Sequence, residues 1–174
     1  DWNPEEGWVE FIFMVVGKPT NMLSASEAGD SLEDVAGPLG QPSEFADGKW
    51  GLIGGGVGVA IAFPIARKLV KEGKDVHAIM GARTKDLLLL EDQFRSILPD
   101  AHIHITTDDG SYGEKGVVTA PEERLLEAGQ IDHIFCVGPV PMMKFAPLPA
   151  VKDDCPITAS LTPIMVDGTG MGGC

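Results

Sequence analysis

Residues 54–60 read Gly-Gly-Gly-Val-Gly-Val-Ala. They join an apolar run, Trp50–Gly54, to a segment, Val57–Glu72, in which apolar residues recur with the 3.6-residue period of an α-helix. The run predicts a buried strand, and the period predicts a helix with a basic C-terminal end. Glycines at such a junction let backbone amides approach a pyrophosphate, and the helix N-terminus adds partial positive charge. The residues expected to contact a nucleotide here are Gly54, Gly55, Gly56, Val57 and Gly58. A tight turn with close helix packing is the alternative.

The sequence after this loop alternates apolar runs with helical periods. Further strands are expected at 76–82, 102–107, 131–137 and 157–161, and further helices at 87–98, at 121–128 and directly after Pro141. Together with Trp50–Gly54 they predict an α/β fold, an open parallel five-stranded sheet with helices on both faces. Pro64 would kink the first helix unless it lies in the first turn, so we expect that helix to begin near Val59.

The loops that follow the strands are expected to meet at one edge of the sheet, where ligands bind. Arg83 and Lys85 follow the second strand, where an NAD-binding protein usually has an acid, and they suit a 2′-phosphate or stacking on adenine. A solvated basic loop is the alternative for this pair. The polar and glycine-rich loop after the third strand comprises Asp109, Gly110, Ser111, Tyr112 and Gly113. The loop after the fourth strand contributes Gly138, Pro139 and Met142, although helix packing explains the methionine equally well.

The first 47 residues differ from the rest, because they hold ten acidic residues and one base, Lys18. Within them, 9–16 predicts a strand, 17–20 a turn, and 31–36 a short extended segment that ends in glycine and proline. We therefore place a domain boundary after residue 45; the further division into 46–165 and a terminal segment, 166–174, is implied by the family resemblance below.

Five segments carry a family resemblance: GGGVGVA, GAR, DDGSYGEKG, GPVPMMK and SLTPIMVDGTGM. In this order they resemble the NAD(P)H-binding part of the ferredoxin-NADP reductase superfamily. More narrowly, they are similar to electron-transfer subunits of dihydroorotate dehydrogenase, sulfide dehydrogenase, NADH-dependent reduced ferredoxin:NADP oxidoreductase and soluble NAD(P)-linked hydrogenases. The resemblance covers essentially the whole chain.

The resemblance implies that residues 1–45 are the C-terminal remnant of a flavin-binding β-barrel, with Gly17, Lys18 and Thr20 beside the flavin. A simple turn hydroxyl is the alternative for Thr20. It also implies that 166–174 begins a truncated iron-sulfur segment, in which Cys174 is what remains of the metal ligands. FAD and a 2Fe-2S cluster are therefore expected in the full-length protein and not in this chain, which we expect to bind NAD(P)H.

The function that follows from the resemblance is the NAD(P)H-binding portion of an oxidoreductase subunit, passing electrons between nicotinamide, FAD and iron-sulfur centres. A partner redox subunit is implied, and a homodimer is left open. No acid-base catalytic residue is expected, and the isolated chain is expected to be inactive. The alternative is a nucleotide-binding or subunit-docking module without turnover of its own. The choice between NADH and NADPH stays open.

Composition excludes other classes. The formal charge of −13 argues against nucleic-acid binding. The charge-free run 50–66 contains five glycines and a proline and is too short for a membrane span, and with no signal peptide visible we expect a cytoplasmic protein. Three distant cysteines suggest reduced thiols. His102 and His104 share one face of a predicted strand, but we expect no metal site because no third ligand has a suggestive spacing.

Overall fold

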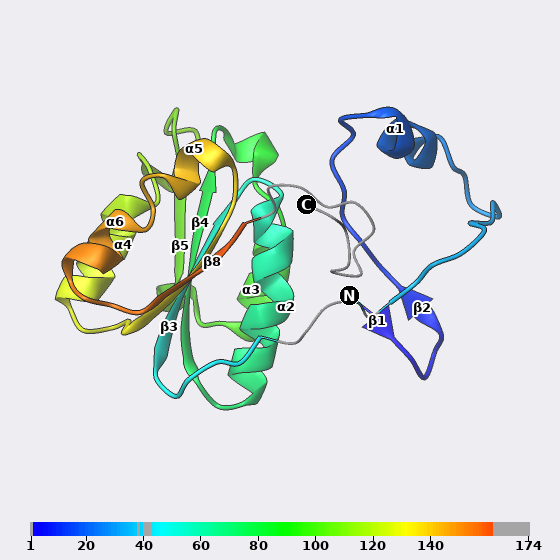
Figure 1. Ribbon diagram of the computed structural model, residues 1–174. Helices are drawn as coiled ribbons and strands as arrows, with labels where there is room; N and C mark the ends of the chain where they lie inside the picture. Colours follow the sequence, from blue (N-terminus) through cyan, green and yellow to red (C-terminus); the bar gives the residue numbers. More distant parts are fainter. Residues whose placement is uncertain (1, 38, 40–42, 162–174) are drawn as a thin grey trace, which may run out of the picture. The chain divides into compact units, whose positions relative to one another are not determined.

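The computed structural model describes residues 2–37, 39 and 43–161 (Figure 1). Residues 46–161 form one compact unit, and the described residues before them belong to a second unit.

The larger unit contains a parallel sheet in the order β6-β5-β4-β3-β7-β8. Its strands are β3 (Lys49–Gly55), β4 (Asp75–Ala82), β5 (Ile103–Thr107), β6 (Glu114–Lys115), β7 (His133–Val137) and β8 (Ile157–Ser160). The five predicted strands and the α/β class are confirmed, but the sheet has six strands. The sixth, β6, forms because Gly113 turns the chain at φ +65°, which brings Glu114 beside Thr106.

Helices lie on both faces of this sheet. They are α2 (Gly58–Lys71), α3 (Glu91–Ile97), α4 (Thr119–Glu127), α5 (Val140–Met143) and α6 (Leu148–Lys152), with short 3-10 turns η1 (Lys85–Leu87) and η2 (Asp100–His102). Figure 1 shows α2 and α3 on one face and α4 and α6 on the other. Phe63 of α2 and Phe94 of α3 meet edge to face, with ring centroids 5.2 Å apart.

Four helices differ from their predicted bounds, and α6 was not predicted. The helix expected after Pro141, α5, already begins at Val140. The first helix, α2, begins at Gly58, one residue before the expected start, and continues through Pro64. The predicted helix 87–98 is shorter, because Leu90 adopts a left-handed conformation (φ +59°) and α3 starts only after it. The predicted helix 121–128 starts earlier, at Thr119, and Gly129 (φ +62°) follows its end as expected.

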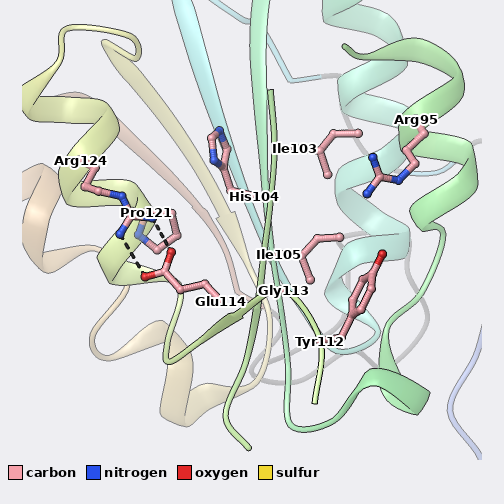
Figure 2. A pocket seen from close by; sticks show the side chains of 9 residues that line it. All are labelled: Arg95, Ile103, His104, Ile105, Tyr112, Gly113, Glu114, Pro121 and Arg124. Atoms are coloured by element: carbon pink, nitrogen blue, oxygen red, sulfur yellow. Dashed lines mark hydrogen bonds and ion pairs between the residues drawn. The ribbon is translucent and has the colours of Figure 1, made fainter. Parts of the chain in front are cut away.

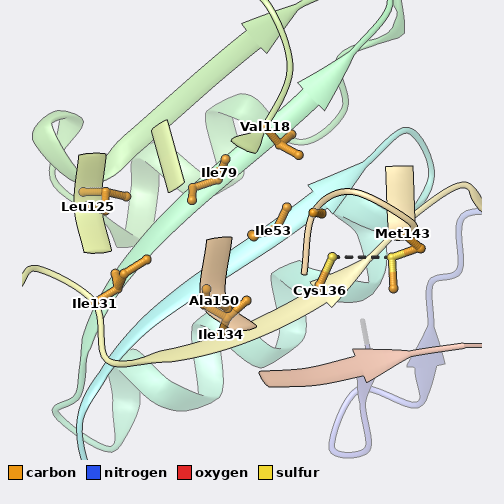
Figure 3. Packing of buried hydrophobic residues seen from close by; sticks show 10 residues of the cluster. Ile53, Ile79, Val118, Leu125, Ile131, Ile134, Cys136, Met143 and Ala150 are labelled. Atoms are coloured by element: carbon orange, nitrogen blue, oxygen red, sulfur yellow. Dashed lines mark hydrogen bonds between the residues drawn. The ribbon is translucent and has the colours of Figure 1, made fainter. Parts of the chain in front are cut away.

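The core lies between the sheet and the α4–α6 layer. Ile53 of β3, Ile79 of β4 and Ile134 of β7 are fully buried there (Figure 3). They face Leu125 and Ala150 on the covering helices. This layer fixes the strands whose carboxyl ends carry the predicted ligand loops.

The N-terminal unit differs from its prediction. Its strands are β1 (Trp2–Asn3) and β2 (Trp8–Val9), which pair antiparallel. The predicted strand 9–16 is wrong beyond Val9, because residues 10–16 pair with no strand of the described chain. The predicted turn 17–20 opens a helix, α1 (Lys18–Ser24), with Pro19 in its first turn, and 31–36 forms no strand. None of the helices in the described residues has both the length and the apolar character needed to cross a membrane.

Candidate functional site

The glycine loop joins β3 to α2, as the strand-loop-helix pattern predicted. Two of its glycines are required by packing. A Cβ atom on Gly58 would lie 2.5 Å from the Val137 carbonyl oxygen, and one on Gly54 would lie 3.0 Å from Cα of Val59. Close contact between helix and sheet therefore accounts for these two positions, which is the alternative that the sequence left open.

Met142 packs against both Gly55 and Gly138 with the flexible end of its side chain. A Cβ on Gly138 would lie 2.5 Å from Cε of Met142, and one on Gly55 would overlap its Sδ. Pro139 also touches this position, with Cδ 3.2 Å from a Cβ on Gly55. The structure thus brings the loop after β7 onto the glycine loop, with Met142 packed between them.

Gly56 is the open position of the loop. It adopts φ +53°, and the nearest atom to a Cβ placed there is Pro139 Cγ at 3.9 Å. Its N–H donates to the Gly81 carbonyl oxygen at 3.1 Å, which ties the loop to the end of β4. A ligand phosphate would therefore meet bare backbone at Gly56 and Val57, immediately before the N-terminus of the 14-residue helix α2.

The loops after β4 and β5 are hydrogen-bonded to each other. The Lys85 N–H donates to Ser111 Oγ at 2.9 Å, and the Asp109 N–H donates to the Arg83 carbonyl oxygen at 3.3 Å. The Arg83 and Lys85 side chains are exposed. The structure therefore holds these two loops together and presents two cationic side chains to solvent beside them.

The Asp109 carboxylate organises the turn at 109–113. It accepts hydrogen bonds from Ser111 Oγ at 2.7 Å and from the Ser111 N–H at 2.9 Å, and these bonds lower the pKa of Asp109. Gly110 (φ +77°) and Gly113 (φ +65°) supply the left-handed conformations that the turn needs. Asp109 is therefore ionised and already engaged within its own loop.

Tyr112 links this loop to α3. Its hydroxyl donates to Glu91 Oε1 at 2.7 Å, and Lys85 Nζ lies 4.8 Å from the centre of its ring. Burial tends to raise the pKa of Glu91, but hydrogen bonds from Tyr112 and Arg95 outweigh it and leave that pKa lowered. The hydrogen bond to Glu91 raises the pKa of Tyr112, so the phenol stays neutral.

A cavity of about 410 Å³ lies beside this tyrosine, at the edge of the sheet (Figure 2). Its wall is made of Arg95, Ile103, His104, Ile105, Tyr112, Gly113, Glu114, Pro121 and Arg124. Both arginines are already paired, Arg95 with Glu91 and Asp100, and Arg124 with Glu114. Only Tyr112 and Gly113 of the predicted contacts line it. The cavity therefore does not mark the glycine loop, whose backbone is open at the sheet edge.

The N-terminal candidates are arranged around a turn. Thr20 Oγ1 accepts hydrogen bonds from the N–H groups of Val16 (3.0 Å) and Gly17 (3.1 Å) and donates to the Gly17 carbonyl oxygen at 3.1 Å. The hydroxyl is therefore engaged within the start of α1, as the turn alternative has it, while Lys18 is exposed. Cys174 and the segment 166–174 lie outside the described residues.

Sequence reasoning missed one buried acid. Glu122 on α4 is fully buried, and neither carboxylate oxygen has a partner in the described part of the chain. Burial raises its pKa to about 8. Its spacing from Val118 and Leu125 places it on the apolar face of α4, and that periodicity was the signal for its burial. Nearby Cys136 is also fully buried, and burial together with Glu122 raises its pKa to about 12.

Comparisons with known proteins agree with this geometry. The sequence profile of the oxidoreductase NAD-binding domain matches residues 52–147. The chain is 47% identical over 174 residues to the Thermotoga maritima "dihydroorotate dehydrogenase B (NAD(+)), electron transfer subunit homolog", covering 99% of this chain and 61% of that protein. It is 35% identical to the Geobacillus kaustophilus electron transfer subunit of dihydroorotate dehydrogenase B, covering 98% of this chain and 64% of that protein.

One solved structure is also similar. It is that of NADH-dependent reduced ferredoxin-NADP oxidoreductase, studied for flavin-based electron bifurcation, with a TM-score of 0.79 and 46% sequence identity. The likeness covers 92% of this chain and 58% of that one. This chain thus spans about three fifths of the length of these relatives. The profile match and the strand-loop-helix geometry show that the chain belongs to the oxidoreductase NAD-binding domain family, of the ferredoxin-NADP reductase type.

Proposed function

We propose that this chain is the nucleotide-binding portion of an electron-transfer subunit that uses NAD(P)H. The observation that carries the proposal is the open backbone at Gly56, at the carboxyl edge of a parallel sheet and before α2. A nucleotide phosphate there would meet backbone that no side chain covers and the positive end of the helix dipole. Membership of the NAD-binding family supports the same ligand.

The residues assigned to the nucleotide have different tasks. Val57 binds the pyrophosphate through its backbone N–H, Gly56 leaves the approach free of a side chain while its own N–H stays on the Gly81 carbonyl oxygen, and Gly54, Gly55 and Gly58 let the loop pack closely. Arg83 and Lys85 interact with the adenosine end, where both cations are exposed. The hydrogen-bonded turn at 109–113 supports the ribose region.

The nicotinamide end is assigned to the loop after β7. Gly138 and Pro139 lie against the glycine loop, and Met142 limits how deep a ring can enter there. NAD(P)H, when bound, would supply a hydride for transfer to a flavin of the full-length protein. This chain's residues position the nucleotide and take up no proton in that transfer.

The flavin and the 2Fe-2S cluster are assigned to the full-length protein. The start of α1 keeps the turn that we assign beside a flavin, but the Thr20 hydroxyl and the Gly17 backbone are hydrogen-bonded to each other, so we assign the contact to the exposed Lys18. We propose a partner redox subunit as well, because relatives of this chain are electron transfer subunits of dihydroorotate dehydrogenase B.

Calorimetric titration with NADH and NADPH tests the proposal. Gly56→Ala places a methyl group where the phosphate would approach, and we expect at least about tenfold weaker binding, roughly 1.4 kcal/mol. Gly73→Ala is the matched control, because Gly73 also has a positive φ (+77°) and no atom lies within 4 Å of its added Cβ. Both variants strain the backbone by about 1 kcal/mol. The difference between their nucleotide affinities therefore measures the effect of the methyl group at the proposed phosphate site. No binding of either nucleotide to the wild-type chain would refute the proposal.

A further inference from the structure

A second cluster of polar side chains lies at the other end of the sheet strands. Asp75 is the first residue of β4, His77 follows two residues later, and His102 ends η2 just before β5. Because β4 runs from Asp75 toward Ala82, these residues lie at its amino end, whereas the glycine loop is bonded to Gly81 at its carboxyl end. The nucleotide site does not use them.

One oxygen of Asp75 and one ring nitrogen from each of His77 and His102 lie within 4.8 Å of one another. The two imidazole rings are stacked, with centroids 4.1 Å apart and an interplanar angle of 11°. His77 is almost completely buried, while His102 and Asp75 are partly exposed. The cluster therefore has one fixed member inside the protein and two members at the surface that can adjust.

Hydrogen bonds leave one nitrogen available on each ring. His102 Nδ1 lies 3.1 Å from the Val76 carbonyl oxygen and 3.3 Å from Asp75 Oδ1. Because a carbonyl only accepts, the proton is on Nδ1 and the lone pair is on Nε2, and Asp75 must turn from Nδ1 toward Nε2 to share an ion with it. His77 Nδ1 is paired with His104 Nε2 at 3.1 Å, which leaves His77 Nε2 for another partner. A second-shell partner on one nitrogen is the usual arrangement for histidines that bind a metal through the other.

Imidazole nitrogens with one carboxylate form a ligand set for borderline divalent ions such as Zn²⁺. We propose that Asp75, His77 and His102 form a binding site for Zn²⁺ or a similar divalent transition-metal ion, with water completing the coordination. Metal–ligand bonds of about 2.1 Å place two ligand atoms at most about 4.2 Å apart. The stacked rings must therefore turn out of their parallel arrangement for their nitrogens to converge. The surface positions of Asp75 and His102 allow this movement around the buried His77.

Zinc titration of the full chain by calorimetry tests the proposal. We expect one Zn²⁺ per chain in the wild type, and at least tenfold weaker affinity in both Asp75→Asn and His102→Gln. These two residues are partly exposed, so neither substitution removes a core side chain. His133→Gln is the matched control, because His133 also pairs with an aspartate, Asp132, at 2.7 Å and lies outside the cluster. Its affinity should equal that of the wild type.

Two results would overturn the proposal. The first is a wild-type chain that binds no Zn²⁺. The second is equal affinity in the wild type, Asp75→Asn and His102→Gln, which would assign the ion to other ligands such as the cysteine thiols. Circular dichroism of each variant shows whether it is folded, and His77→Gln extends the test to the buried ligand when that variant folds.

Discussion

Residues 9–16 and strand β4 are both largely apolar runs of eight residues, yet only β4 is a complete strand. Val76 and Ile79 of β4 are 1% and 0% exposed, whereas Val9 and Val16 are 54% and 76% exposed. The difference lies in pairing, because β4 has parallel partners on both sides, β3 and β5. Local preference for extended backbone therefore becomes a strand only where neighbouring strands and covering helices bury it.

The same substitution in both regions tests this contrast, with the largest expected effect. Ile79→Ala removes a fully buried side chain from the core, so the free energy of unfolding should fall by about 2–5 kcal/mol. Ile12→Ala, at a position 42% exposed, should change it by less than about 0.5 kcal/mol. Urea denaturation of the full chain measures both. Equal losses would mean that residues 9–16 are buried in solution.

Glu122 sharpens the contrast, because the sheet unit buries a carboxyl group without a partner. Burial raises its pKa to about 8 in the folded chain, from an ordinary value of 4.5. The folded state therefore keeps a proton that the unfolded state has released, and stability falls as pH rises from about 4.5 to about 8. His77 acts in the opposite sense between about pH 4 and 6.5, because burial lowers its pKa.

The window from about pH 6.5 to 8 thus isolates Glu122. Wild-type stability should fall there by about 2 kcal/mol relative to Glu122→Gln, at up to about 1.4 kcal/mol per pH unit. Urea denaturation at several pH values measures this difference. Glu127→Gln removes a charge from an exposed position on the same helix and serves as the control. Parallel pH profiles for the wild type and Glu122→Gln would show that the buried carboxyl group does not titrate in this range.

The sequence predicted those strands, turns and helices that are determined by residues adjacent in the chain. The order Trp50–Gly54, glycine loop, helix predicted β3 and α2 to within a residue or two, because a buried strand, a turn and an amphipathic helix each leave a signature in adjacent residues. Gly129 likewise marked the end of α4. The order of strands and loops alone also predicted that the candidate site residues follow the ends of the strands.

The errors concern contacts between distant residues. Strand β6 exists because Gly113 lets the chain turn beside Ile105, and no periodicity over two residues can show that. The histidine cluster joins His77 to His102 through the pairing of β4 with β5 and the turn before β5. Met142 against Gly55 is a further example, since it depends on how β7 is placed beside β3. Register, rather than composition, decides each of these.

Charge offers a smaller test of the contrast between the regions. The first 47 residues hold one base, whereas exposed Arg83 and Lys85 lie on the sheet unit beside the assigned nucleotide site. If Arg83 meets a 2′-phosphate, Arg83→Ala should weaken NADPH about tenfold, roughly 1.4 kcal/mol, and NADH much less. Lys152→Ala, which removes an exposed base from α6, is the control. Calorimetry that finds equal losses for both nucleotides would remove this role.

The smallest expected effect comes from removing the N-terminal unit. Residues 46–161 alone should unfold cooperatively and bind NADH within about twofold of the full chain, because the assigned contacts lie within them. The Ala46 carbonyl oxygen is held by Lys74 Nζ at 2.6 Å and by Trp50 Nε1 at 3.2 Å. A chain of residues 48–161 lacks that carbonyl and should lose about 1 kcal/mol per hydrogen bond. If fragment 46–161 fails to fold, the sheet unit depends on residues before Ala46. That result would contradict the contrast between the buried strand β4 and the exposed residues 9–16.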